Sequence, residues 1–86
     1  MPTISVFYGI YVYMYWAEHS PPHFHAQYNA DEALIDIRTL ALLKCDLPRR
    51  EKRLVLSWAQ KHRSELLENW TLCSQGKYPN QIDPSM

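Results

Sequence analysis

The chain has 86 residues, of which 47% are apolar, and nine Lys and Arg side chains balance nine Asp and Glu. This length accommodates one domain with a modest core and excludes a second domain. Zero net charge excludes a global electrostatic attraction to nucleic acid or to an anionic membrane, so binding to either would require a local patch.

No segment is typical of membrane insertion or secretion. The longest apolar run, residues 6–17, is too short to cross a bilayer and follows no charged segment of the kind that begins a signal peptide. Cys45 and Cys73 lie outside any C-x-x-C pattern, and we expect both to be reduced thiols packed in the fold. These features favour a cytoplasmic protein that has no membrane partner.

The first half of the chain shows the alternation of apolar and polar residues that is typical of strands. We expect four strands and a further short one, at residues 4–8, 10–16, 23–28, 32–38 and 41–45.

Three tyrosines in the second expected strand share one face. Tyr11, Tyr13 and Tyr15 alternate with the better core residues Ile10, Val12, Met14 and Trp16. The tyrosines are therefore candidate partner-binding residues on the uncovered side of the sheet, because tyrosine is favoured at protein interfaces and also stacks on RNA bases. Plain packing between strands is the alternative.

The segment HSPPHFHAQY, residues 19–28, holds three of the four histidines. Alternation along a strand places His23 and His25 opposite the core face. A short turn at residues 29–31 and the match of apolar faces then favour a register that pairs Ala26 with Ile35. In this register His25 lies opposite Asp36 and His23 opposite Arg38, so a carboxylate would fix the imidazole tautomer and favour the protonated ring.

Three interpretations of these histidines remain open. His23, His25 and Asp36 are candidate catalytic residues for metal-free acid–base chemistry such as phosphodiester cleavage, which requires no cofactor, although no nucleophile is evident. Alternatively, His19, His23 and His25 form a metal site with one open position, as catalytic zinc requires. In the third interpretation the histidines are half-exposed structural residues that are hydrogen-bonded to Asp36.

After Leu47 the hydrophobic period becomes that of a helix. We expect a helix over residues 48–75 that begins at Pro48, with the Asp46 carboxylate at its start and a kink or break near residues 62–64. One apolar stripe runs along it: Leu54, Val55, Trp58, Ala59, His62, Leu66, Trp70 and Cys73. Gly76 would end the helix.

These elements predict an α+β domain over residues 1–76. A small antiparallel sheet of four to five strands, about residues 3–45, would be covered on one face by the C-terminal helix or kinked helix pair. Residues 77–86 contain two prolines and are expected to form a tail that is extended or is ordered only by a partner. The uncovered face of the sheet is the expected place of function.

Four arginines are candidate nucleic-acid-binding residues: Arg38, Arg49, Arg50 and Arg53. The last three cluster in the first turns of the expected helix, where the positive end of the helix dipole would add to their attraction for phosphate. A solvated helix face that is partly neutralised by Glu51 is the alternative.

Three segments resemble a known family: MPTISVFYGIYVYMY, EHSPPHFHAQY and LPRREKRLVLSWAQKHRSELLENW. Together they are similar to an uncharacterised group of small prokaryotic proteins, domain-of-unknown-function family 4160. The resemblance extends to about Gly76, and PPHFHA is its most specific part. Where this chain has Asn29, Ala30 and Asp31 the family commonly has glycine, and where it has Tyr13 arginine is common, which favours a protein interface over an RNA platform.

The resemblance implies a partner and a function. Members of the family look like one half of two-gene units that resemble type II toxin–antitoxin pairs, the other half being domain-of-unknown-function family 2442. It therefore implies a toxin that inhibits growth through RNA or translation and that a small cognate antitoxin neutralises. With the acid–base interpretation of the histidines, such a toxin would be a metal-independent ribonuclease. Two alternative functions remain: a non-enzymatic binding module (antitoxin-like or an adaptor) and a His-rich metal-dependent hydrolase. A homo-oligomer is also compatible with the sequence.

Overall fold

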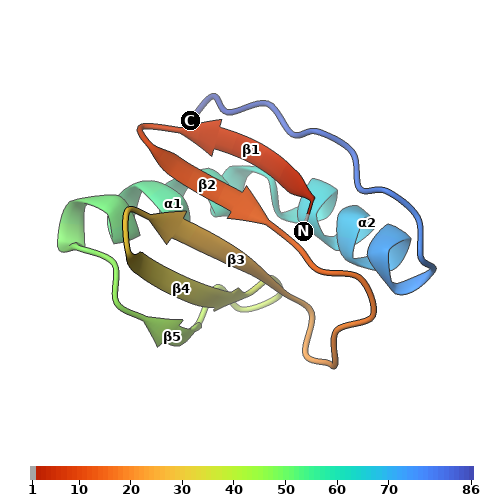
Figure 1. Cartoon of the computed structure of the whole chain (residues 1–86). Coiled ribbons are helices and arrows are strands. Elements are labelled where there is room, and N and C mark those ends of the chain that lie inside the picture. Colours follow the sequence, from red (N-terminus) through yellow and green to blue (C-terminus); the bar gives the residue numbers. More distant parts are fainter. Residues whose placement is uncertain (1) are drawn as a thin grey trace.

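The computed structural model describes residues 2–86 and contains a five-stranded antiparallel sheet followed by two helices (Figure 1). The strands lie in chain order: β1 (Thr3–Phe7), β2 (Ile10–Tyr13), β3 (His23–Tyr28), β4 (Asp31–Asp36) and β5 (Leu42–Cys45). The helices are α1 (Arg49–Lys61) and α2 (Arg63–Ser74). The predicted α+β fold is confirmed. Residue 1, which the sequence assigned to the domain, lies outside the described residues.

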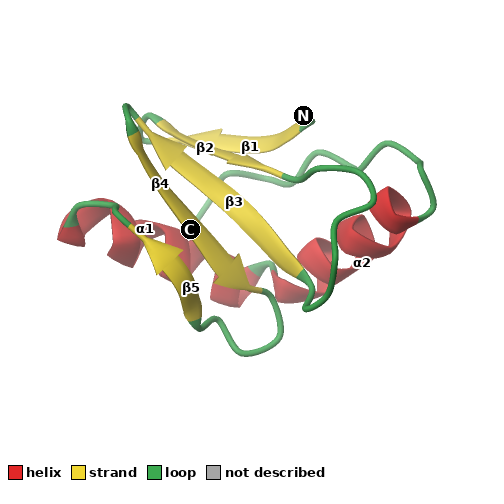
Figure 2. Cartoon of the chain, turned by 60° about the horizontal axis from the view of Figure 1, so that its bottom comes forward, coloured by secondary structure: helices red, strands yellow, loops and turns green. Residues whose placement is uncertain are grey.

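The hydrophobic core lies between the sheet and the helices, which pack against the same face (Figures 1 and 2). Alternation along the strands supplies Val12, Phe24 and Ile35 to this face, and all three side chains are buried. Trp58 of α1 lies at the centre, with its ring 5.0 Å from that of Phe7 and 6.3 Å from that of Phe24. The predicted apolar stripe of the helical region is therefore the surface that covers the sheet.

The second strand ends at Tyr13, earlier than the sequence predicted. Met14 still packs in the core, but Trp16 does not. Its indole Nε1 donates a hydrogen bond to the main-chain oxygen of Lys77, and its ring contacts Tyr78 edge to face. The assignment of Trp16 to the core is therefore wrong, because the chain leaves the sheet before reaching it.

The hairpin of β3 and β4 differs from the predicted register. Its turn consists of Asn29 and Ala30 alone, and Ala26 pairs with Ala33 rather than with Ile35. Asn29 adopts a φ of 52°, which Asn tolerates better than most residues, so a two-residue turn suffices. The apolar faces still match, because a shift of two residues keeps every side chain on its face.

This register separates the residue pairs that the sequence placed together. His25 lies opposite Leu34 and His23 opposite Asp36, so the predicted His25–Asp36 and His23–Arg38 pairs are wrong. The Asp36 carboxylate accepts hydrogen bonds from the main-chain N–H groups of Arg38 and Thr39, at 2.8 and 3.0 Å. The Thr39 bond is the main cause that lowers the pKa of Asp36. Asp36 thus organises the β4–β5 turn.

The helical region is divided at His62, where the sequence predicted a kink or break. Pro48 precedes the first helical residue rather than occupying it, and no side chain among the described residues caps the start of α1, so the predicted role of Asp46 is wrong. Gly76 follows α2 with a φ of 74°, a left-handed conformation that glycine adopts without strain, and the helix ends as predicted.

Among residues 2–86, no helix is long and apolar enough to cross a membrane. Cys45 and Cys73 are free thiols.

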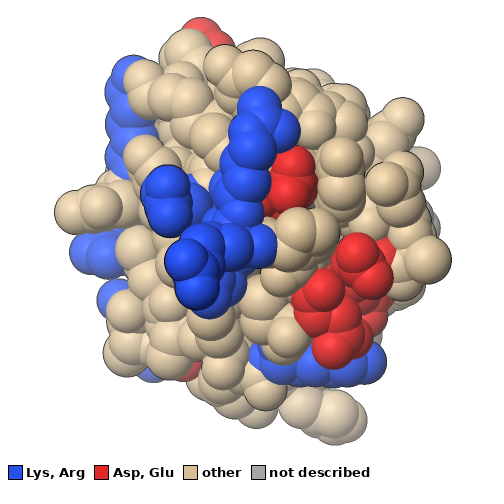
Figure 3. Space-filling model, turned by 90° about the vertical axis from the view of Figure 1, so that its left-hand side faces the viewer, with Lys and Arg blue, Asp and Glu red and all other residues tan. Residues whose placement is uncertain are grey.

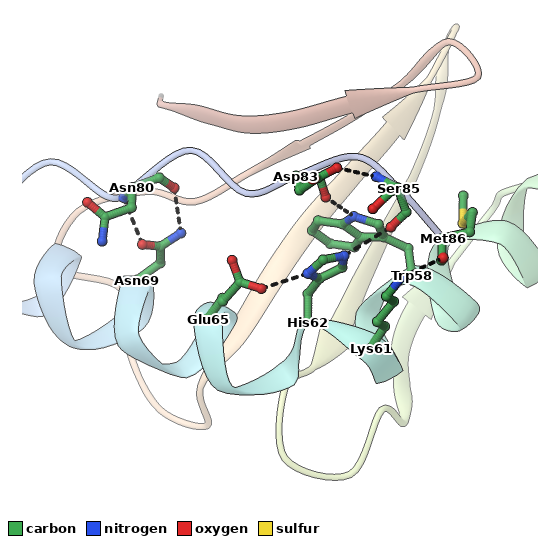
Figure 4. A network of polar contacts seen from close by, with 9 residues as sticks. All are labelled: Trp58, Lys61, His62, Glu65, Asn69, Asn80, Asp83, Ser85 and Met86. Carbon is green, nitrogen blue, oxygen red and sulfur yellow. Dashed lines mark hydrogen bonds and ion pairs between the residues drawn. The ribbon is translucent and has the colours of Figure 1, made fainter.

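The sequence predicted a C-terminal tail, residues 77–86, that is extended or is ordered only by a partner. In the structure these residues form neither helix nor strand and are held by contacts with their own domain. The tail runs beside β1 (Figure 1), where the N–H of the buried Ile82 donates to the main-chain oxygen of Ile4 at 2.8 Å. The indole of Trp58 donates to the main-chain oxygen of Asp83 at 3.0 Å (Figure 4). The tail therefore covers the outer edge of β1 and the end of the core.

Candidate functional site

His23 and His25 lie at the start of β3 and are buried, with only 7% and 6% of their surfaces exposed. The His25 ring stacks on that of Tyr13, its neighbour across the strand pair, with centroids 5.0 Å apart. The His23 ring packs at 5.1 Å against Trp70 of α2. The face that the sequence left uncovered is therefore covered at this end of the sheet.

A third polar side chain reaches the histidines from the loop between β2 and β3. This loop, residues 14–22, passes on the side of α2 (Figure 2) and brings in Glu18. Glu18 Oε1 accepts a hydrogen bond from His25 Nε2 at 2.8 Å and lies 3.2 Å from His23 Nε2. The Glu18 side chain is 25% exposed, which makes it the most accessible member of the cluster.

The tautomer of His23 follows from its neighbours. Its Nδ1 lies 2.8 Å from the main-chain oxygen of Pro21, which can only accept, so Nδ1 carries a hydrogen. In a neutral ring Nε2 then presents a lone pair to Glu18. In the described part of the chain, His23 Nε2 and His25 Nδ1 are buried and make no hydrogen bond, although Glu18 Oε1 lies 3.2 Å from His23 Nε2.

Opposing effects act on the Glu18 carboxyl. Burial would raise its pKa, but the hydrogen bond from His25 and the charges of His25 and His23 outweigh burial and hold the pKa below its usual value. Burial, and secondarily the charge of Glu18, raises the pKa of the nearby Cys73 thiol. The cluster thus combines an ionised carboxylate with two imidazoles, beside a thiol that stays protonated.

The structure brings together only part of the predicted sets. His23, His25 and Glu18 place one ligand atom each within 4.8 Å of one another, whereas His19 is exposed and Asp36 serves the β4–β5 turn. Glu18 lies in a loop, where no periodicity indicates which way a side chain points. Its proximity to the histidine strand in sequence was the only available signal.

The four candidate arginines do not form a single patch. Arg49, Arg50 and Arg53 are exposed in the first turns of α1, on a side of the molecule where Lys and Arg gather (Figure 3). Arg50 lies 5.8 Å above the ring of Tyr8, in the β1–β2 turn. Arg38 is in the β4–β5 turn, at the opposite end of β5, because that strand separates the turn from α1.

The three tyrosines differ in exposure. Tyr11 and Tyr15 are 52% and 39% exposed, whereas Tyr13 is 1% exposed. The Tyr13 hydroxyl donates to Glu32 Oε2 at 2.6 Å, and burial together with this carboxylate raises the pKa of Tyr13. The expectation of three exposed rings is therefore wrong for Tyr13, whose ring supports His25 instead.

The fold and this site define a small α+β domain in which a loop glutamate closes over a histidine-bearing strand. Residues 9–71, more than half of the chain, match a family described as "Domain of unknown function (DUF4160)". The chain therefore belongs to this family. No curated protein and no solved structure matches it.

Proposed function

We propose that this protein is the toxin of a type II toxin–antitoxin pair, that it inhibits growth through RNA or translation in the cytoplasm, and that a small cognate antitoxin neutralises it. The resemblance of the family to two-gene toxin units motivates the pairing. The observation that carries the proposal is the cluster of Glu18, His23 and His25. These side chains come from the β2–β3 loop and from β3, and the rings of Tyr13 and Trp70 pack against the two histidines.

A carboxylate held against two imidazoles suits the chemistry of phosphodiesters. Imidazole transfers protons or contacts phosphate near neutral pH, and a hydrogen-bonded carboxylate orients the ring. Burial fixes the rings, since His25 is stacked on Tyr13 and His23 is hydrogen-bonded to Pro21. In the proposed site Glu18 takes the place that the sequence assigned to Asp36.

The arginines would contact the nucleic acid backbone. Arg50 lies near the Tyr8 turn, which is adjacent to the Tyr28 end of β3, whereas the histidines lie at the other end of that strand. Six extended residues span roughly 20 Å. An RNA that contacts both the first turn of α1 and the cluster would therefore extend along the sheet.

Growth after induced expression tests this proposal. Wild type and His19→Ala are expected to arrest growth, because His19 lies outside the cluster. His25→Ala and the nearly isosteric Glu18→Gln are expected to relieve the arrest while circular dichroism shows both variants folded. Arrest by a folded His25→Ala variant, or growth of cells that express the wild type, would contradict the proposal.

A non-enzymatic binding module is the second candidate. It is favoured by the difference between the two edges of the sheet, of which one is covered and the other is open. The tail occupies the outer edge of β1, whereas within residues 2–86 no strand lies beside the outer edge of β5. Leu42 and Leu43 of β5 are exposed, as are Tyr11 and Tyr15. Such an edge can accept a strand from a partner.

Binding measurements combined with growth assays separate the two candidates. In a binding module, Leu43→Glu and Tyr11→Ala are expected to abolish the complex with the cognate partner, whereas His25→Ala leaves the complex intact and no variant arrests growth. If the protein is a toxin, the same surface would bind the antitoxin. Leu43→Glu would then remain toxic even when the antitoxin is coexpressed.

A further inference from the structure

The geometry of Glu18, His23 and His25 points to a metal site. The two His Nε2 atoms lie 2.8 and 3.2 Å from Glu18 Oε1, and all three atoms lie within 4.8 Å of one another. A tetrahedral zinc ion with bonds of about 2.0–2.2 Å holds neighbouring ligand atoms about 3.3 Å apart. Two of the three ligand pairs therefore already lie near the separation that the ion requires, and zinc would replace the hydrogen that His25 Nε2 donates to Glu18.

The donor set is one that zinc uses in proteins. Two imidazole nitrogens and one carboxylate oxygen form the three-ligand shell of several catalytic zinc sites, in which water or substrate takes the fourth position. Glu18 is the member that reaches the surface, with its side chain 25% exposed. An open fourth position would therefore lie on the loop side of the cluster.

The buried ring of His23 is oriented as the ring of a metal ligand would be. A ligating histidine usually donates its other N–H to a carbonyl or carboxylate, which fixes the tautomer. His23 has this arrangement, since Nδ1 donates to the oxygen of Pro21 at 2.8 Å, and in the neutral ring, the form that binds a metal, the Nε2 lone pair is directed into the cluster. Nε2 is buried and makes no well-formed hydrogen bond in the described part of the chain, although Glu18 Oε1 lies 3.2 Å away. A metal ion would satisfy it.

One feature of His25 differs from this pattern. Its Nδ1 is buried and has no hydrogen-bond partner among the described groups. The ring is instead held by aromatic contacts, stacked on Tyr13 and in edge contact with Tyr15 at 4.9 Å. These contacts fix the direction of Nε2 towards Glu18 without a second hydrogen bond.

We infer that the protein binds one Zn²⁺ ion through Glu18 Oε1, His23 Nε2 and His25 Nε2, with the fourth position open to a small ligand. The metal site predicted from the sequence consisted of His19, His23 and His25. In the inferred site Glu18 takes the place of His19. Only the chemistry that zinc would supply, the polarisation of a phosphate oxygen or of bound water, rests on the proposed toxin function, and in the zinc-bound site it would replace proton transfer by the two imidazoles.

The test uses the full chain, purified without a histidine tag and treated with chelator before dialysis. Isothermal titration calorimetry with Zn²⁺ is expected to give one site per chain. Co²⁺ is expected to produce the intense visible bands of a four-coordinate ion. Because zinc binds the folded site, it is also expected to raise Tm, by on the order of 10 °C at a hundredfold excess over Kd.

Variants locate the site. Glu18→Gln and His25→Ala are expected to weaken Zn²⁺ binding at least tenfold and to abolish the Co²⁺ bands, whereas the neighbouring His19→Ala leaves both unchanged. Glu18→Gln keeps the size and polarity of the side chain, so it remains informative if His25→Ala does not fold. Circular dichroism verifies that each variant is folded.

Three results would overturn the inference: no Zn²⁺ binding by the folded wild type, binding that Glu18→Gln leaves unchanged, or binding that His19→Ala abolishes. The outcome is separable from that of the proposed function. Zinc binding by a protein that does not arrest growth would refute the toxin proposal alone. Growth arrest by a protein that binds no zinc would refute the metal site alone.

Discussion

His62 connects the helices to the C-terminal tail, because its Nε2 donates a hydrogen bond to the main-chain oxygen of Ser85 at 3.0 Å (Figure 4). Its Nδ1 lies 2.7 Å from Glu65 Oε1. Both neighbours are acceptors only, so both ring nitrogens must donate and the buried ring is favoured in its charged form. Burial would lower the pKa of His62, but the bonds to Glu65 and Ser85 and the charge of Glu65 outweigh burial and raise it above the usual value.

This contact predicts a pH-dependent stability. Because the folded-state pKa of His62 is raised above the unfolded value of about 6.5, its stabilisation is complete below that value and is lost as pH rises through the folded-state pKa. Urea unfolding of the wild type between about pH 5.5 and 8.5 is expected to show a steeper loss of stability than in His62→Gln. Subtracting the two profiles removes the contributions of the other titrating groups.

The environment of His62 supplies a matched control. Glu65 favours the charged ring, as does the nearby Asp83 carboxylate, while Lys61 opposes it. Glu65→Gln is therefore expected to remove most of the pH dependence while leaving the tail in place. Parallel stability profiles for wild type and His62→Gln would show that His62 does not titrate as argued.

The tail is predicted to stabilise the domain through Ile82. Its side chain is 4% exposed within the core cluster that contains Trp58, so Ile82→Ala is expected to lower the free energy of unfolding by about 2–4 kcal/mol. Gln81 is exposed, and its side chain donates a hydrogen bond to the main-chain oxygen of Thr3. Gln81→Ala is the control, with an expected cost below about 1 kcal/mol. Equal effects in urea unfolding would mean that the tail does not pack as described.

The β3–β4 turn is predicted to depend on the left-handed conformation of Asn29. Its φ of 52° strains any side chain that has a Cβ, and Asn is among the best tolerated. Asn29→Ala is expected to destabilise the protein by about 1–2 kcal/mol, whereas Asn29→Gly is expected to be nearly neutral. Thermal unfolding of the two variants checks this. An alanine variant as stable as the glycine variant would indicate another turn.

The same turn shows what the sequence determines and what it leaves open. Alternation along residues 23–28 predicted that strand with its observed bounds, because each strand face is either apolar or polar. Matching two apolar faces excludes every second register, but it does not distinguish registers that differ by two residues. The length of the turn decides between them, and it depended on the backbone conformation of one asparagine. The predicted His25–Asp36 pair failed for this reason alone.

Glu18 and the tail could not be placed from the sequence for a different reason. The tail is held by contacts between distant parts of the chain, such as Trp58 with Asp83, whereas Glu18 is placed by the path of its loop, and neither depends on a local pattern. A loop residue has no periodicity, and a polar tail with one isoleucine resembles a mobile end. In contrast, the core stripe of the helices was predictable, because burial of one face repeats every three to four residues.

The basic first turns of α1 are predicted to contact RNA. Arg49 and Arg53 are exposed, so their charges can reach phosphates. The double variant Arg49→Glu and Arg53→Glu is expected to weaken binding of a single-stranded RNA roughly tenfold and to reduce the slope of log K against log salt by about 0.7 for each lost contact. Fluorescence anisotropy at several salt concentrations measures both quantities.

Two further charge reversals distinguish RNA binding through a local patch of arginines from RNA binding that depends on the net charge of the protein. Lys77→Glu changes an exposed cation in the tail and is expected to leave the salt slope unchanged. Arg38→Glu changes a cation at the end of the sheet where Asp36 pairs with His23. A reduced slope of log K against log salt in this variant would indicate that the RNA extends along the sheet to the cluster. If Lys77→Glu weakens binding as much as a reversal in α1 does, binding follows net charge. The arginines of α1 then have no specific role.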